Sequence, residues 1–173
     1  MTILIAFATI EGQTEKIAGF VADTVREHGH DVWLMDTTDR TAPVSFDGVD
    51  RVVLAASVHE RKHPKPFEVF LTAHAEDLAA RPCLLLSVSL SAAFPEGMEE
   101  AHEYVVEMKM RTGLKTSAEV LVPGAIRTHR YDYYARQVLR HVVMRGKDYD
   151  DSQTEHEFTD WDALKMEVVR FLG

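Results

Sequence analysis

Short apolar segments that alternate with longer amphipathic segments constrain the fold of this chain more than any other feature of its sequence. Five segments rich in apolar and β-branched residues are predicted as strands, at 2–7, 31–35, 51–56, 83–88 and 118–122. Between them, apolar residues recur at helical spacing, in the sets Ile17, Val21, Val25; Phe67, Phe70, Leu71, His74; and Tyr104, Val105, Met108. This alternation predicts βαβ units and a doubly wound parallel sheet with helices on both faces.

The length and composition of the chain are typical of one soluble globular domain. Its 173 residues can bury a substantial core, and 46% of them are hydrophobic and 27% charged. No apolar stretch reaches the length of a membrane span, and the N-terminal apolar run lacks the length and the basic flank of a signal peptide. We therefore expect a single domain, 1–173, that remains in the cytoplasm. A last helix is predicted over 161–172, with Thr159 or Asp160 as its N-cap.

Cysteine and histidine usage predicts neither a disulfide nor a metal site. The single cysteine, Cys83, falls within a predicted strand and is interpreted as a buried, inert thiol rather than a nucleophile. One cysteine cannot form a disulfide within the chain. The nine histidines show no ligand spacing, so we infer no metal.

The first predicted strand leads directly into residues 9–14, Thr-Ile-Glu-Gly-Gln-Thr, and then into an amphipathic helix. The first-turn amides of such a helix lack intrahelical partners and carry the positive end of its dipole, so they favour an anion. Thr9 and Thr14 offer hydroxyl donors, and Gly12 lets the backbone approach a ligand closely. The loop has neither the Lys-Ser or Lys-Thr pair of a P-loop nor a G-x-G-x-x-G pattern, which favours a monophosphate. The alternative is a capped helix without a ligand.

Two further loops should meet this one at an edge of the sheet, because the carboxyl ends of parallel strands lie together. Residues 57–64, after the third strand, are rich in ionisable side chains, although a solvated loop has the same composition. Residues 89–95, after the fourth strand, are mostly small or carry hydroxyls, and could lie against a flat ring. A phosphate at the first loop and a planar ring between the other two describe a site for flavin mononucleotide (FMN).

Several motifs carry a resemblance to known proteins: 7–14, 50–53 with 56–57, 87–90, 124–127 with 130–131, and 159–161. Through them the chain resembles the flavodoxin superfamily, and within it the menaquinone-dependent protoporphyrinogen IX dehydrogenases. The resemblance implies a flavodoxin-like α/β fold, a doubly wound five-stranded parallel sheet in the order 2-1-3-4-5 with a long insertion near the fifth strand. It also implies FMN phosphate contacts from Thr9, Ile10, Glu11, Gly12, Gln13 and Thr14, and ring contacts from Ser57, Val58, His59, Ser89, Leu90, Ser91, Ala92 and Ala93.

The chain departs from this family at both loops that are expected to flank the ring. Where the family has aromatic residues and glycine in the second loop, this chain has Glu60, Arg61, Lys62 and His63. Basic residues of the third loop are replaced by Ala92, Ala93, Phe94 and Glu96. These changes fall where the ring or its substrate should lie.

The stretch 127–159 is predicted as an insertion with a basic amphipathic helix. Residues 127–147 carry six arginine or lysine side chains and one carboxylate, whereas 148–162 carry seven carboxylates and no basic side chain. Three explanations compete: the helix packs on the domain with its arginines solvated or ion-paired, it contacts an anionic membrane near a lipid quinone, or its arginines bind the carboxylates of a substrate such as a porphyrinogen. The candidate contact residues are Arg127, Arg130, Arg136 and Arg140.

The leading hypothesis is an FMN-dependent oxidoreductase that oxidises protoporphyrinogen IX, or a related reduced substrate, with a quinone as electron acceptor in heme biosynthesis. His59 is the candidate acid or base because an imidazole can exchange protons near neutral pH, and a structural histidine is the alternative. The competing hypotheses are a flavodoxin-type electron carrier that docks protein partners and a flavodoxin-like binding module without a cofactor. The net charge of −9 argues against a nucleic-acid partner. The expected location is the cytoplasm, with peripheral contact to the inner face of the cell membrane.

Overall fold

A five-stranded parallel sheet organises the protein, for which a computed structural model describes residues 1–127 and 155–173. The strand order is β2-β1-β3-β4-β5, as predicted. The strands are β1 (Thr2–Ala8), β2 (Asp31–Asp36), β3 (Arg51–Ser57), β4 (Cys83–Ser89) and β5 (Ala118–Pro123). Each begins at the residue predicted from the sequence and ends one residue later.

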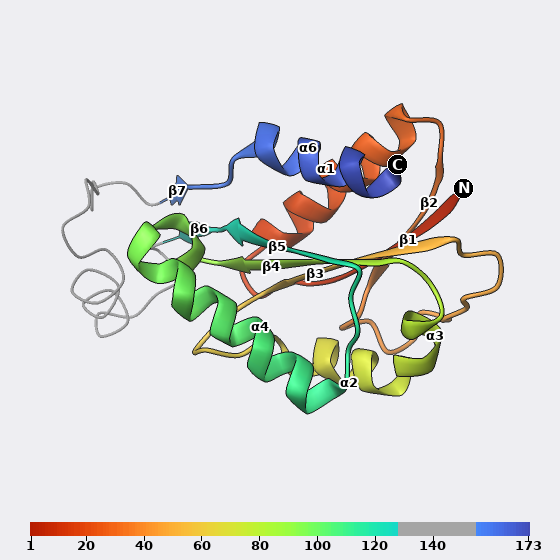
Figure 1. The fold of residues 1–173 in the computed structure, drawn as a ribbon, viewed down its shortest axis with the longest axis horizontal. Helices are drawn as coiled ribbons and strands as arrows, with labels where there is room; N and C mark the ends of the chain where they lie inside the picture. Colours follow the sequence, from red (N-terminus) through yellow and green to blue (C-terminus); the bar gives the residue numbers. More distant parts are fainter. Residues whose placement is uncertain (128–154) are drawn as a thin grey trace.

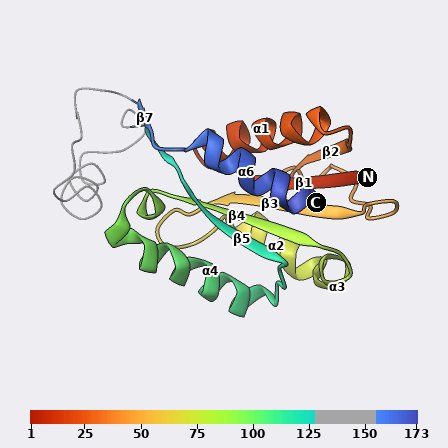
Figure 2. The same cartoon turned by 45° about the horizontal axis from the view of Figure 1, so that its top comes forward.

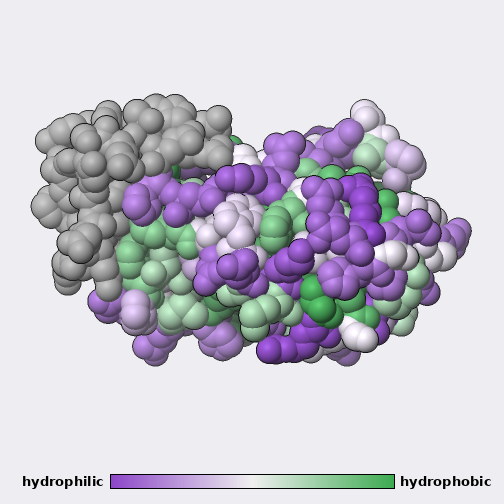
Figure 3. Space-filling model, turned by 90° about the horizontal axis from the view of Figure 1, so that it is seen from above, coloured by the Kyte–Doolittle hydropathy of each residue, from purple (hydrophilic) through white to green (hydrophobic). Residues whose placement is uncertain are grey.

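Helices cover both faces of the sheet (Figure 1, Figure 2). One face carries α1 (Gln13–Glu27) and α6 (Trp161–Leu172), and the other carries α2 (Lys65–Ala73), α3 (Ala75–Ala79) and α4 (Met98–Thr112). Seen from the side of α1 and α6, the described surface mixes hydrophilic side chains with smaller apolar areas (Figure 3), while the apolar stripes of these helices face the sheet. None of the helices in residues 1–127 and 155–173 is long and apolar enough to cross a bilayer.

The core has two layers, one on each side of the sheet. Along β1, Ile3, Ile5 and Phe7 pack with α1 and α6, whereas Leu4, Ala6 and Ala8 pack on the side of α2 and α4. Burial on both faces explains why the central strands are continuous apolar runs rather than alternating ones. Cys83 lies in the second layer and is 1% exposed, and burial raises the pKa of its thiol to about 12. The predicted burial of this cysteine is therefore confirmed.

The ends of two helices refine the sequence prediction. Asp160 is the N-cap of α6, and its side chain accepts a hydrogen bond from the Ala163 amide at 3.0 Å. Thr159, the other candidate cap, instead donates to the Pro123 carbonyl at 2.7 Å. His74 was predicted to share a helix with Phe67, Phe70 and Leu71, but it lies between two helices. Helix α2 ends at Ala73 and α3 begins at Ala75.

A short antiparallel ribbon extends from the end of β5 (Figure 1). It pairs β6 (Ala125–Arg127) with β7 (Glu155–Glu157), so that Arg127 lies opposite Glu155 in the register. A third, small apolar cluster joins the ribbon to the loop after β4, with Phe94 and Ile126 buried at its centre and Leu90, Ala93 and Phe158 around them. The predicted basic helix, with Arg130, Arg136 and Arg140, lies outside the described residues.

Candidate functional site

The loop after β1, residues 9–14, closes around a glycine that no other residue could replace without strain. Gly12 has φ +95°, in the left-handed region, and α1 begins at the next residue. The Gly12 amide donates to Thr9 Oγ1 at 2.8 Å. A threonine hydroxyl that accepts one hydrogen bond can still donate its own proton, so Thr9 remains available to an anion.

Two buried hydroxyls lie near this loop without a hydrogen-bond partner among the described residues. They are Thr14 Oγ1, in the first turn of α1, and Ser57 Oγ, at the end of β3. Along β3, Val53 and Ala55 pack on the side of α1, so the alternation of the strand directs Ser57 to the same side. Buried hydroxyls normally find a partner, and a missing one costs free energy. These two donors, together with the first-turn amides of α1, fit the oxygens of a phosphate group.

A carboxylate on β7 holds the first turn of α1 in place. Glu157 accepts hydrogen bonds from Gln13 Nε2 at 3.1 Å, Lys16 Nζ at 2.6 Å and Trp161 Nε1 at 2.7 Å. Partial burial acts to raise the pKa of Glu157, but the hydrogen bonds from Lys16, Trp161 and Gln13 outweigh it and lower that pKa. We call this cluster the Glu157 brace. The sequence does not predict this cluster, because Glu157 falls within an acidic run and its partners lie far away along the chain.

The second loop, residues 57–64, is attached to β4 at both of its ends. The Val58 amide donates to the Val88 carbonyl at 2.8 Å, and His63 Nε2 lies 2.9 Å from Ser87 Oγ. Between these points, His59 and Lys62 exchange two backbone hydrogen bonds, of 2.9 and 3.0 Å, across a tight turn. The side chain of His59 is exposed at this turn.

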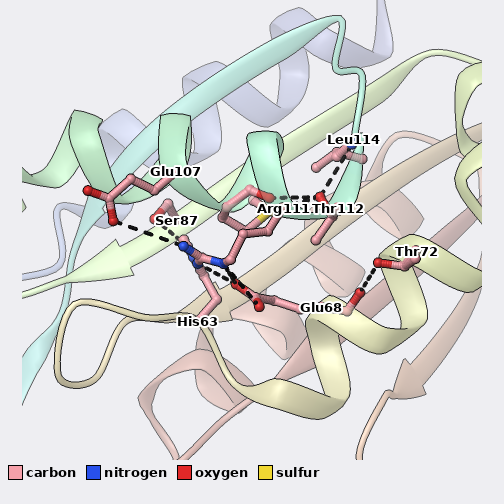
Figure 4. A network of polar contacts seen from close by, with 9 residues as sticks. His63, Glu68, Thr72, Ser87, Glu107, Arg111, Thr112 and Leu114 are labelled. Carbon is pink, nitrogen blue, oxygen red and sulfur yellow. Dashed lines mark hydrogen bonds and ion pairs between the residues drawn. The ribbon is translucent and has the colours of Figure 1, made fainter.

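His63 is the buried histidine of the second loop (Figure 4). It is 3% exposed, and its Nδ1 has no partner within the described part of the chain. Burial lowers its pKa from 6.5 to about 4, with Glu68 acting against the shift and Arg111 adding to it. Glu68 and Arg111 form their own ion pair at 2.5 Å, which joins α2 to α4. The imidazole of His63 is therefore neutral at physiological pH. The sequence alone does not single out His63 from His59, the histidine predicted as acid or base.

The third loop, which the structure extends to Gly97, folds as two short 3₁₀ turns, η1 (Ser91–Ala93) and η2 (Pro95–Gly97). A Cβ at position 97 would overlap the carbonyl oxygen of Ser91, so this close approach requires glycine. Ser89 Oγ accepts from the Ala92 amide at 3.2 Å, and Ser91 Oγ lies 3.3 Å from the Tyr104 hydroxyl. Leu90 and Ala93 remain partly exposed, whereas Ser89, Ser91 and Ala92 are buried.

The three loops follow β1, β3 and β4, which are neighbours in the sheet and run in the same direction. They therefore meet at one edge, on the side where β6 and β7 project (Figure 1). Of the residues predicted to contact the cofactor, Ile10 is 47% exposed and Val58 is partly exposed. Among the proposed substrate or membrane arginines, only the backbone of Arg127 is described, in β6.

The match to a known protein family covers most of the chain. Residues 4–153 match the family described as Flavodoxin domain. The chain belongs to this family. Its predicted resemblance to flavodoxins is thereby confirmed, and family membership supports the predicted FMN cofactor.

Individual flavodoxin-family relatives and structures agree with this assignment. The chain is 28% identical over 165 residues to the protoporphyrinogen IX dehydrogenase [quinone] of Escherichia coli K12. The aligned segment covers 95% of this chain and 91% of the E. coli protein. The crystal structure of oxidised flavodoxin 1 from Bacillus cereus superposes with a TM-score of 0.58 at 17% identity, over 99% of this chain and 97% of the other. A Fusobacterium nucleatum flavodoxin crystallised with flavin mononucleotide gives a TM-score of 0.52 at 12% identity, over 99% and 94% of the two chains. Both likenesses concern the fold.

Proposed function

We propose that the protein is an FMN-dependent oxidoreductase in which one domain, 1–173, carries the whole cofactor site. The observation that carries this proposal is the pair of buried hydroxyls of Thr14 and Ser57, which have no hydrogen-bond partner in residues 1–127 and 155–173, beside the left-handed Gly12. FMN, when bound, supplies the capacity to accept a hydride or the equivalent two electrons and a proton. The chain binds the phosphate through the first loop and Ser57, and encloses the ring between 58–59 and 89–93. Ser57 is assigned to the phosphate, and not to the ring as the resemblance implies, because its buried hydroxyl is directed to the side of α1.

Protoporphyrinogen IX, or a related reduced substrate, is the proposed electron donor, and a quinone is the proposed acceptor. The E. coli relative bears the name of this activity and aligns over nearly the whole of both chains, which supports the assignment. Arg127, Arg130, Arg136 and Arg140 are proposed to contact the carboxylates of such a substrate or an anionic membrane on the cytoplasmic side. His59, exposed on the second loop, is the proposed proton-transfer residue.

An electron carrier that docks a redox protein is the second candidate. The net charge of −9 favours it, because an acidic surface steers basic partners into contact. Two experiments distinguish the enzyme from the electron carrier. In one, the purified protein is reduced anaerobically and a menaquinone analogue is added. In the other, protoporphyrinogen is added to the oxidised protein. The enzyme should turn over both compounds. A protein that reacts with neither would be a carrier.

The cofactor site is tested by titrating the protein with FMN and with riboflavin, which lacks the phosphate. Thr14→Val and Ser57→Ala each remove one hydroxyl with little change in shape. Each should weaken FMN binding about tenfold and leave riboflavin binding unchanged, since a hydrogen bond to a charged group contributes about 1.5–3 kcal/mol.

The matched control for these variants is Thr24→Val, because Thr24 is a buried threonine on the same helix. It is 2% exposed, and its hydroxyl donates to the Phe20 carbonyl at 2.9 Å. This variant should keep the affinity of the parent protein for FMN. A parent protein that takes up neither flavin would refute the proposed function.

A further inference from the structure

The tip of the second loop adopts a backbone conformation that side chains normally avoid. Glu60 and Arg61 have φ values of 49° and 67°, so two consecutive residues other than glycine lie in the left-handed region. Each such residue costs about 1 kcal/mol or more relative to ordinary backbone, and persists where surrounding contacts hold it. The contacts that hold this turn are therefore of functional interest.

Arg61 ties the strained turn to α4. Its Nη1 lies 2.6 Å from Glu100 Oε1 and its Nη2 lies 3.6 Å from Glu103 Oε2. The guanidinium also lies over the ring of Tyr104, at 5.3 Å from the centroid. A single exposed ion pair contributes little, but here one planar cation joins two carboxylates and an aromatic face at once.

Two of these side chains on α4, Glu100 and Tyr104, also contact the third loop. The Ser91 hydroxyl donates to Glu100 Oε2 at 3.4 Å, and the Tyr104 hydroxyl lies 3.3 Å from Ser91 Oγ. Burial raises the pKa of Tyr104, and either hydroxyl can be the donor in its contact with Ser91. A continuous polar path thus runs from the second loop through α4 to the third loop. We call Arg61, Glu100, Tyr104 and Ser91 the loop bridge.

We propose that Arg61 is a positioning residue that sets the separation of the two loops flanking the flavin ring, through the loop bridge. This inference rests on the proposed function, because the second and third loops are the ones assigned to the ring. The ends of the second loop are attached to β4 at Val58 and His63, so Arg61 acts on the tip between them. The phosphate donors Thr14 and Ser57 take no part in the bridge.

Removing Arg61 has two physical consequences. The strained tip loses its attachment to α4, so the ring should bind less tightly whether or not the ligand carries a phosphate. Glu100 and Glu103 also lose their shared cation, which makes the net charge beside the second loop more negative and disfavours the electron-rich reduced flavin. The midpoint potential of the bound flavin should therefore become more negative.

The test compares Arg61→Gln with Arg26→Gln. Arg26 is a matched control, since it pairs with Asp23 at 3.0 Å on α1 and its side chain is 54% exposed, against 52% for Arg61. For Arg61→Gln, the dissociation constants of riboflavin and FMN should both rise about fivefold, which corresponds to about 1 kcal/mol, and their ratio should stay constant. Arg61→Lys keeps the positive charge and should restore most of the potential. Arg26→Gln should match the parent protein.

Amide hydrogen exchange of the flavin-free protein provides a readout that needs no cofactor. Arg61→Gln should speed exchange in both 58–63 and 91–94, because the bridge couples the two loops. Unchanged exchange in 91–94, unchanged riboflavin binding, or weakened binding of FMN alone would each overturn the proposed role of Arg61. A parent protein that binds no flavin would overturn the proposed function instead, and the exchange rates would still decide whether the bridge exists.

Discussion

The buried imidazole of His63 should make the stability of this protein depend on pH in a defined interval. Its pKa is lowered in the folded protein from 6.5 to about 4 by burial, and the unfolded chain restores the ordinary value. Between these two values the unfolded state binds a proton that the folded state does not. The contribution of His63 to stability is therefore fully present above pH 6.5 and is lost as the pH falls from there toward 4.

The size of this effect follows from the difference between the two pKa values. The full loss is about 3 kcal/mol, and about 2 kcal/mol of it should have occurred at about pH 5. This is a large share of the 5–15 kcal/mol or so by which a typical domain is stable. Glu68, which faces the imidazole, favours its protonated form and reduces the loss, whereas Arg111 increases it.

Urea unfolding of the parent protein and of His63→Gln, over a series of pH values, measures the effect. Glutamine does not titrate and can still bond to Ser87 Oγ, which His63 Nε2 contacts at 2.9 Å. The carboxylates titrate similarly in both proteins, so they largely cancel in the difference. The stability advantage of the parent should shrink by about 2 kcal/mol between about pH 7.5 and about pH 5. His102→Gln, at an exposed position on α4, controls for the loss of an imidazole.

Parallel stability curves for the parent and His63→Gln would refute this reasoning. They would mean that the imidazole reaches solvent in the folded protein, or that Glu68 stabilises its protonated form as much as water does. In either case the burial of His63 beneath the second loop would not control its protonation.

Two further substitutions test the packing around the site. Gly97→Ala places a Cβ against the Ser91 carbonyl oxygen and should destabilise the protein by about 1–3 kcal/mol. The midpoint of thermal unfolding should therefore fall. An unchanged midpoint would show that the third loop can open without a free-energy cost. Arg111→Met leaves Glu68, 8% exposed, without its cation and should cost about 1–3 kcal/mol in urea unfolding. The double variant Glu68→Gln with Arg111→Met should recover part of that loss, and a double variant less stable than Arg111→Met alone would contradict the ion-pair explanation.

The strands could be predicted because the signal for each is local, whereas their order was predicted from the resemblance to flavodoxins. Strands β1, β3 and β4 are buried on both faces, which forces an unbroken apolar run whatever the rest of the chain does. The apolar stripe of Ile17, Val21 and Val25 is likewise a local signal, because these residues lie on successive turns of one helix. All three are buried as expected.

The features that could not be predicted depend on contacts between distant segments. The ribbon of β6 and β7 has only three residues in each strand, too few for a periodic pattern, and its partners are separated by the insertion. Nothing near His59 and His63 in the sequence distinguishes the exposed histidine from the buried one. That difference arises from Ser87 on β4 and from the helices α2 and α4, which cover His63.

The Glu157 brace connects the helix that follows the phosphate loop to the C-terminal segment of the chain. Gln13 and Glu157 are separated by 144 positions, yet they share a hydrogen bond at the first turn of the helix that carries the phosphate loop. A substitution at either position alters the environment of the other, so their acceptable residues are mutually constrained. A recombinant chain that inherits the phosphate loop from one parent and the C-terminal segment from another can lose this hydrogen bond. Chimeras of related proteins should therefore fold more often when the phosphate loop and the C-terminal segment come from the same parent.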